Sequence, residues 1–237
     1  TIRGYFYQFD HSILQLLRLS NGLDSIDIER IEDVDINTAT ETTAIQCKYY
    51  AKTEYNHSVI GSPIRFMLSD YKNRKDSSRP SVRYRIYGKY ESGQEKLILP
   101  LSADFLRKHF LTYKEKEIQH YHHNELGLTD DGLDEFIGLL TIDINAKPYE
   151  EQYQDVLSEI RSCFSCSDFE AEHYYYNNAL SVVRSLSTQP NVHDRRIKKA
   201  DFISRIDKKE LLFNEWFIDL KGRKEYIREI RKQYFTL

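Results

Sequence analysis

The sequence predicts an α/β protein with a helical C-terminal part, and three observations lead to this fold class. Over residues 1–95 the spacing of apolar residues changes between the helical period and the alternation of a strand, in the order helix, strand, strand, strand, helix, strand. From Pro100 onward the spacing is almost wholly helical. The composition shifts near residues 91–100, which predicts two domains: an αβββαβ core over 1–95 and an all-helical domain over 96–237.

Each element of the core follows from its apolar spacing and from the residues that start or stop it. The expected elements are a helix over residues 9–19, short strands over 26–29 and 34–36, a longer strand over 42–50, a helix over 58–75 and a strand within 81–90. Asn21 and Gly22 end the first helix, because glycine readily adopts the left-handed conformation of a helix C-terminus. Pro63 fits the first turns of the second helix.

The region after residue 95 predicts helices only. They are expected over residues 102–113, 129–140, 149–163, 168–186, 198–206 and 211–234, the last with a weak point at Gly222.

Composition and charge indicate a soluble globular protein. The 237 residues are 40% hydrophobic and 30% charged with a net charge of −3, which is typical neither of a disordered chain nor of a protein that coats nucleic acid. No apolar run approaches the roughly 20 residues that cross a bilayer, and the first residues do not resemble a signal peptide. Three cysteines cannot make a disulfide framework, so we expect a cytoplasmic protein without membrane contact.

The strand over residues 42–50 carries two polar side chains on one face. Gln46 and Lys48 are two residues apart, and because strand side chains alternate, they point the same way. Buried polar groups need partners, and the acidic residues of the preceding hairpin, Glu29, Asp33 and Asp35, can supply them. This pattern predicts a metal-dependent phosphodiesterase site. The structural alternative is a solvated acidic hairpin beside an edge lysine.

Phosphodiester hydrolysis needs these residue types. Mg²⁺ or Mn²⁺ prefers oxygen ligands, which Asp33, with Glu29 or Asp35, and the carbonyl oxygen of Gln46 can provide. Such an ion activates water and offsets the charge of the transition state. The Lys48 ammonium can orient the attacking water or stabilise that charge. Asp33 and Asp35 are two residues apart, so on a strand their side chains point the same way. The sequence therefore leaves open which of them faces the lysine.

These motifs, in this order, resemble the PD-(D/E)XK nuclease superfamily. Asp33 precedes the string Gln46-Cys47-Lys48 within the αβββαβ order, and glutamine replaces the usual second acidic residue, as in the Mrr-like restriction endonuclease branch. The local strings also resemble the N-terminal effector nucleases of bacterial anti-phage systems of the CBASS and Lamassu type; they are GYFYQ at residues 4–8, IERIEDV at 28–34 and IQCKYY at 45–50. The resemblance covers about residues 4–90, the length of one small domain.

The resemblance implies a restriction-endonuclease-like fold that cleaves DNA, with double-stranded DNA as the expected substrate. In that family the aspartate and the lysine of the motif act with a divalent metal, which carries over to Asp33, Gln46 and Lys48. Glu29 is then a candidate additional ligand. Gln8 stands where related nucleases often place a helix carboxylate, so its role is open. The alternative is a catalytically inactive nuclease-fold subunit that binds DNA or serves as an adaptor.

A second resemblance concerns the C-terminal part. The string DRRIKK at residues 194–199, with Phe202, Trp216 and Phe217, resembles the helical domain of three-component systems built around an SMC-like ATPase. In Lamassu-type assemblies such a domain anchors the nuclease to its partners. The resemblance therefore implies an anti-phage effector that is controlled by an SMC-like ATPase and a further accessory subunit, and that is active as a homo-oligomer.

Two other clusters have the residue types of a zinc site. They are the imidazoles of His120, His122 and His123 and the thiols of Cys163 and Cys166. Neither cluster has further His or Cys residues at the spacing that a zinc site needs. We therefore expect a polar surface at the histidines and two ordinary thiols at the cysteines.

Overall fold

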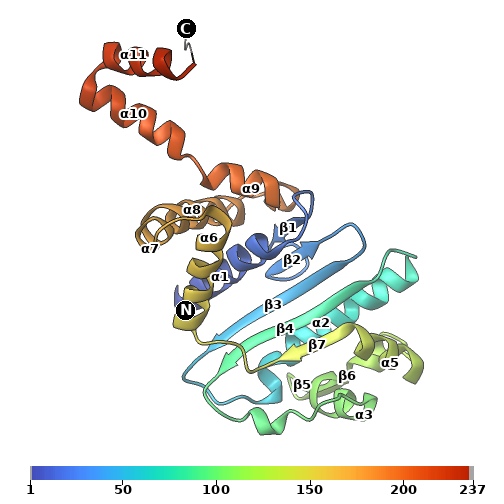
Figure 1. Cartoon of the computed structure of the whole chain (residues 1–237). Coiled ribbons are helices and arrows are strands. Elements are labelled where there is room, and N and C mark those ends of the chain that lie inside the picture. Colours follow the sequence, from blue (N-terminus) through green and yellow to red (C-terminus); the bar gives the residue numbers. More distant parts are fainter. Residues whose placement is uncertain (1, 235–237) are drawn as a thin grey trace.

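A computed structural model describes residues 2–234 and shows an α/β fold built on one mixed, six-stranded sheet. Figure 1 shows the sheet between two groups of helices, with two further helices at the C-terminal end. Along the chain the strands are β1 (Ser25–Ile28), β2 (Val34–Asn37), β3 (Thr42–Tyr50), β4 (Val82–Tyr90), β7 (Leu140–Asp143) and β8 (Arg196–Lys198). Their order in the sheet is β7-β4-β3-β2-β1-β8.

The sheet is antiparallel on one side and parallel on the other. β1, β2 and β3 form an antiparallel meander, and β8 pairs antiparallel with the outer side of β1. β4 runs parallel to β3, and β7 runs parallel to β4. The pairing of β2 with β3 ends at Val34 and Ile45, whereas β4 pairs with β3 up to Tyr50. Among the described residues, positions 46–50 of β3 therefore have a strand partner on one side only.

Helices cover both faces of the sheet (Figure 1). The first face carries α1 (Ile2–Arg18), α6 (Tyr149–Phe164), α8 (Tyr176–Ser187) and α9 (Lys199–Ile206). The second face carries α2 (His57–Asp76), α3 (Ala103–Leu106), the π-helical turn η2 (Arg107–Leu111) and α5 (Asp130–Leu139). The connecting elements are η1 (Gln94–Lys96), β5 (Thr112–Glu115), β6 (Ile118–Tyr121), α4 (His122–Glu125), α7 (Asp168–Glu170), η3 (Ala171–Tyr175) and η4 (Val192–Arg195).

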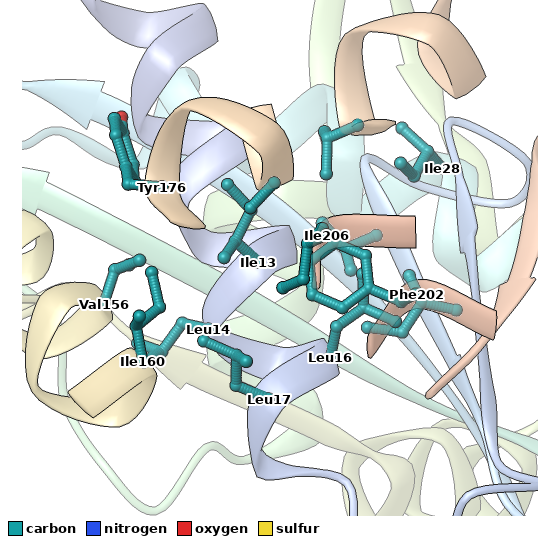
Figure 2. Close-up of a cluster of buried hydrophobic side chains, with 14 of the residues drawn as sticks. Ile13, Leu14, Leu16, Leu17, Ile28, Val156, Ile160, Tyr176, Phe202 and Ile206 are labelled. Atoms are coloured by element: carbon teal, nitrogen blue, oxygen red, sulfur yellow. The ribbon is translucent and has the colours of Figure 1, made fainter. Parts of the chain in front are cut away.

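Each face has its own buried cluster of apolar side chains. α1 is amphipathic because its leucines and isoleucine recur at helical spacing, and Figure 2 shows them packed against α6, α8 and α9. That cluster includes Ile13, Leu14, Leu16, Leu17, Val156, Ile160, Tyr176, Phe202 and Ile206. On the other face, Ile60, Ile64, Met67 and Leu68 of α2 pack on Tyr84 and Ile86 of β4 and on Phe136 of α5. The two clusters fix α1 and α2 on opposite sides of β3.

The elements expected for the first part of the chain are confirmed, and the wholly helical second part is corrected. The predicted helix over 102–113 ends at Leu111, and the chain continues into the hairpin β5–β6. β7 and β8 are the other strands that the sequence did not predict, and both join the main sheet. β7 and β8 have only four and three residues, which is too short for a strand period to be recognised. The sheet thus draws strands from both sides of residue 95; the division into 1–95 and 96–237 stays a prediction about folding units.

The last two helices extend away from the rest of the molecule. α10 (Lys209–Lys221) and α11 (Arg223–Tyr234) are separated at Gly222, the weak point that the sequence indicates, where the backbone φ is +81°. Neither helix has a buried residue. Figure 1 shows the pair projecting beyond α9. Within residues 2–234, no helix combines the length and apolar character that spanning a bilayer would need.

Candidate active site

Asp33 lies where β2 and β3 separate. In the antiparallel register Val34 is opposite Ile45, so Asp33, one residue earlier, comes opposite Gln46. The Asp33 Oδ2 atom accepts a hydrogen bond from the Gln46 side-chain amide and another, 2.8 Å long, from the backbone nitrogen of Cys47. The side chain of Gln8, on α1, also interacts with this carboxylate and favours its charged form. The carboxylate is thus held from both β3 and α1.

Lys48 lies two residues beyond Gln46, on the same face of β3. Its side chain forms no hydrogen bond and no ion pair with another described residue, so its ammonium is available to a ligand. Burial raises the pKa of the Asp33 carboxyl, while the Cys47 N–H and the Lys48 charge act in the opposite direction. The structure therefore brings Asp33, Gln46 and Lys48 together.

Glu32 is a further acidic residue of the site that the sequence prediction missed. Only 8% of it is exposed, and its Oε1 atom is buried without a hydrogen-bond partner. Burial raises the pKa of Glu32 to about 8, and the nearby charges of Asp33 and Asp35 add to the rise. The Lys48 charge acts in the opposite direction. An unsatisfied buried carboxylate oxygen is costly, so this atom is a natural ligand for a cation.

Asp35 binds the backbone of the hairpin loop with its carboxylate. It is fully buried, and its two carboxylate oxygens accept hydrogen bonds from the backbone nitrogens of Ile31 (2.6 Å) and Glu32 (3.3 Å). These bonds hold the loop that presents Glu32 and Asp33. The sequence left open which of the two aspartates faces Lys48; Asp35 lies within β2, while Asp33 lies in the loop before it.

Glu29 points to a different neighbour. Its backbone φ is +52°, and its carboxylate lies 3.5 Å from the Arg195 guanidinium. The backbone nitrogen of Glu29 donates to the Asp33 carbonyl oxygen over 3.0 Å, which closes the loop between β1 and β2. The tight closure turns the Glu29 side chain outward. The structure gives no contact between Glu29 and the Asp33 carboxylate, and Glu32 lines the site instead.

A hollow of about 390 Å³ opens beside these residues. Glu32, Gln46 and Lys48 form one wall of this hollow. One side of α2 forms the other wall, with Val59, Ser62, Pro63 and Phe66. These α2 positions share a helix face because they are three or four residues apart. The volume is within the range of small-ligand pockets, roughly 300–1,000 Å³. A hydrated cation together with a phosphate group fits a space of this size.

The oxygen donors of the site suit a hard divalent cation. Glu32 and Asp33 provide two carboxylates, and the side-chain amide of Gln46 presents its nitrogen to Asp33. Mg²⁺ is usually bound by one or two carboxylates and keeps several waters or substrate oxygens, so this set is sufficient for it. Among residues 2–234, no group of three or more His, Cys, Asp or Glu side chains is arranged to hold a metal ion.

The histidines and cysteines that resemble zinc ligands have other surroundings. His120 and His122 both approach Glu125, at 2.8 Å and 3.4 Å, and the Nε2 atom of His122 lies 2.9 Å from the Ser69 hydroxyl. These contacts tie the β6–α4 segment to α2. Cys163 and Cys166 are free thiols near the end of α6.

No known family model matches the sequence, and no curated protein matches it either. A proposal for the function therefore rests on the chemistry of the residues around Asp33.

Proposed function

We propose that the chain is a metal-dependent nuclease that hydrolyses DNA phosphodiester bonds, with a restriction-endonuclease-like core. The observation that carries the proposal is the convergence of Asp33, Gln46 and Lys48 where β2 and β3 separate, next to the unsatisfied carboxylate of Glu32. Acidic oxygen ligands beside a lysine without a partner are the combination that phosphodiester hydrolysis requires.

Each side chain has a defined task in this proposal. A bound Mg²⁺ or Mn²⁺ supplies Lewis acidity and lowers the pKa of a water ligand. Glu32 and Asp33 would hold the cation, and the amide oxygen of Gln46 would join them after the amide turns over, because its nitrogen faces Asp33 in the metal-free protein. The Lys48 ammonium orients the attacking water and offsets the charge on the phosphate oxygens. Gln8, on α1, favours the charged form of the Asp33 carboxylate, against the larger effect of burial, which raises its pKa.

The test is a cleavage assay with plasmid, linear duplex and single-stranded DNA in Mg²⁺ or Mn²⁺. Lys48→Ala and Asp33→Ala should each lower the cleavage rate at least about 100-fold, the scale of losing one charge-stabilising group. Lys108→Ala is a matched control, because Lys108 is exposed on η2, outside the hollow. If both site variants remain folded and cleave DNA at the wild-type rate, the proposal is wrong.

One observation favours a second candidate, a catalytically inactive nuclease-fold subunit that binds DNA or serves as an adaptor. The Gln46 amide donates a hydrogen bond to Asp33, so its nitrogen, not its oxygen, faces the carboxylate. A glutamine held in this way lowers the negative charge that a cation would meet. Calorimetric titration with Mg²⁺ or Mn²⁺ separates the candidates, because an inactive site should bind neither ion.

We further propose, on the sequence resemblance, that the nuclease is an anti-phage effector held by an SMC-like ATPase and an accessory subunit. A single site of this size cuts one strand at a time, so a double-strand break needs two copies. Light scattering combined with the cleavage assay tests whether assembly regulates the nuclease. An isolated monomer that cuts DNA at the full rate would contradict it.

A further inference from the structure

We infer that a groove along the free edge of β3 binds an unpaired DNA strand, so that the substrate of this site is single-stranded DNA and not an intact duplex. The part that concerns cleavage rests on the proposed nuclease function. The part that concerns binding rests on the groove alone, and the two can be tested separately.

The groove consists of three hollows that share residues. The hollow beside Glu32 and the next one, between β3 and the start of α1, have Lys48 in common. The second hollow shares Tyr49 and Tyr50 with a third, which reaches Arg3 and Lys52. The three hollows therefore follow one another from Gln46 to Lys52.

The separation of β2 from β3 explains why the groove exists. The pairing of β3 with β2 ends at Ile45 of β3. Among the described residues, the edge of β3 from Gln46 onward is therefore open on that side. The N-terminal end of α1 forms the opposite wall with Tyr5 and Gln8. At about 3.3 Å per residue, the open edge is roughly 15–20 Å long, which accommodates several nucleotides.

The charges along the groove suit a polyanion. Lys48 and Lys52 have no ion-pair partner among the described residues, and Arg3 is paired only with Glu150, at 3.3 Å on the exposed surface. Glu32 is the only carboxylate among the described residues that line the three hollows, and it lies at the end where the cation is proposed to bind. Cations thus lie along the groove and the acid lies at the reaction centre.

Exposed aromatic rings flank Lys48 on both sides. Tyr5 is 60% exposed, Phe66 is 54% exposed and Tyr50 is 38% exposed. The Tyr50 ring is stacked on Tyr90, with centroids 5.6 Å apart, so its orientation is fixed. Proteins that bind single strands combine a basic groove with aromatic rings on which bases stack. In a duplex the bases are already stacked on one another, so these rings would find no partner there.

Fluorescence anisotropy without divalent metal tests the binding. The probes are a dye-labelled oligothymidylate and a labelled duplex of the same length, both with EDTA. We expect the single strand to bind more tightly, and Tyr5→Ala to weaken its binding by about 5- to 150-fold, the range for loss of one base–aromatic contact. Tyr5→Phe keeps the ring and should bind as the wild type does. Phe169→Ala is the matched control, since Phe169 is 71% exposed on α7, outside the groove.

The outcomes separate the inference from the proposed function. If the duplex binds at least as tightly as the single strand and Tyr5→Ala changes nothing, the groove inference is overturned, even if Asp33-dependent cleavage is found. If Tyr5→Ala weakens single-strand binding but no metal supports cleavage, the nuclease proposal fails and the groove inference holds.

Discussion

The carboxylate of Asp33 accepts a 2.8 Å hydrogen bond from the backbone nitrogen of Cys47, just beyond the last residue of β3 that pairs with β2. The side chain of Asp33 thus serves a backbone group that a longer β2 would have paired. A buried N–H group without an acceptor costs about 1–3 kcal/mol, so Asp33 stabilises the separation of the two strands as well as the site.

Substitution of Asp33 should separate these two contributions. Burial raises the pKa of this carboxyl, so the charge itself is unfavourable in the metal-free protein. Asp33→Asn keeps an oxygen acceptor for Cys47 and removes the charge. We expect its free energy of unfolding in EDTA to equal that of the wild type within about 1 kcal/mol, whereas Asp33→Leu should lose about 1–3 kcal/mol. Chemical denaturation in EDTA measures both.

Added Mg²⁺ provides the second half of this test. Binding to the folded state alone raises the melting temperature of the wild type, and Asp33→Asn should abolish that rise. A rise of equal size in both proteins would show that Asp33 does not hold the ion.

The sequence was sufficient for the parts of the fold that have a long, regular period. The alternation of β3 placed Gln46 and Lys48 on one face, and the helical spacing of α1 predicted the buried face that includes Leu14 and Leu17. Even so, the expected first helix began seven residues too late, because Tyr5 and the polar residues near it do not continue the apolar spacing. Local periodicity thus predicts element type better than element ends.

The spacing of apolar residues could not predict how the acidic residues of the site are arranged. Glu32 and Asp33 lie in a closed loop, where side-chain direction depends on individual backbone angles such as the φ of +52° at Glu29. The alternation of side chains along a strand does not extend into such a loop. The sequence therefore could not show which of Asp33, Asp35 and Glu29 faces Lys48. The only sequence signal for Glu32 was its position beside Asp33.

The affinity for Mg²⁺ should depend on pH through Glu32. Burial raises the pKa of Glu32 to about 8, so this carboxyl is mostly protonated at neutral pH in the metal-free protein. A cation must displace that proton. The association constant should therefore rise by up to about tenfold per pH unit below pH 8 and level off above it.

Calorimetry at a series of pH values measures this dependence. Glu32→Gln cannot titrate, so its weaker Mg²⁺ binding should vary much less with pH. An unchanged pH dependence in Glu32→Gln would assign the proton to another group.

Asp10 makes the stability of the folded protein depend on pH. It is fully buried between α1 and α8; its Oδ1 atom accepts a 2.8 Å hydrogen bond from the Tyr176 hydroxyl, and its Oδ2 atom has no partner. Burial raises the pKa of Asp10 from 3.8 to about 7, so the folded state binds the proton more strongly than the unfolded state does. The stabilisation is complete below about pH 4 and is lost as the pH rises through 7.

Asp10→Asn should remove this contribution because an amide does not titrate. Relative to the wild type, the variant should gain up to about 4 kcal/mol in free energy of unfolding between pH 4 and pH 8. Urea denaturation at several pH values measures the difference. Asp131→Asn, at an exposed position of α5, is the control and should leave the pH profile unchanged. Parallel profiles for Asp10→Asn and the wild type would contradict the assignment.

Removal of α10 and α11 should leave the rest of the fold intact. The two helices bury no residue. Lys209 forms an ion pair with Glu170 and lies 5.2 Å from the centre of the Tyr175 ring, and the Lys208 nitrogen donates a 2.9 Å hydrogen bond to the Tyr174 hydroxyl. The ion pair is exposed, and exposed ion pairs contribute little to stability. A chain that ends at Asp207 should therefore melt within about 4 °C of the full chain, by circular dichroism.

The same truncation should lower self-association, because large apolar side chains cover the surface of these helices. They are Leu211 (63% exposed), Phe213 (59%), Trp216 (58%) and Leu220 (81%). Exposed apolar surface of this kind associates with other surfaces in water. Trp216 is the only tryptophan of the chain, so its emission in the full protein should be that of an indole in water and should shift to the blue on association. A blue-shifted emission at the lowest concentration, together with non-cooperative melting of the shortened chain, would show that α10 packs on the body after all.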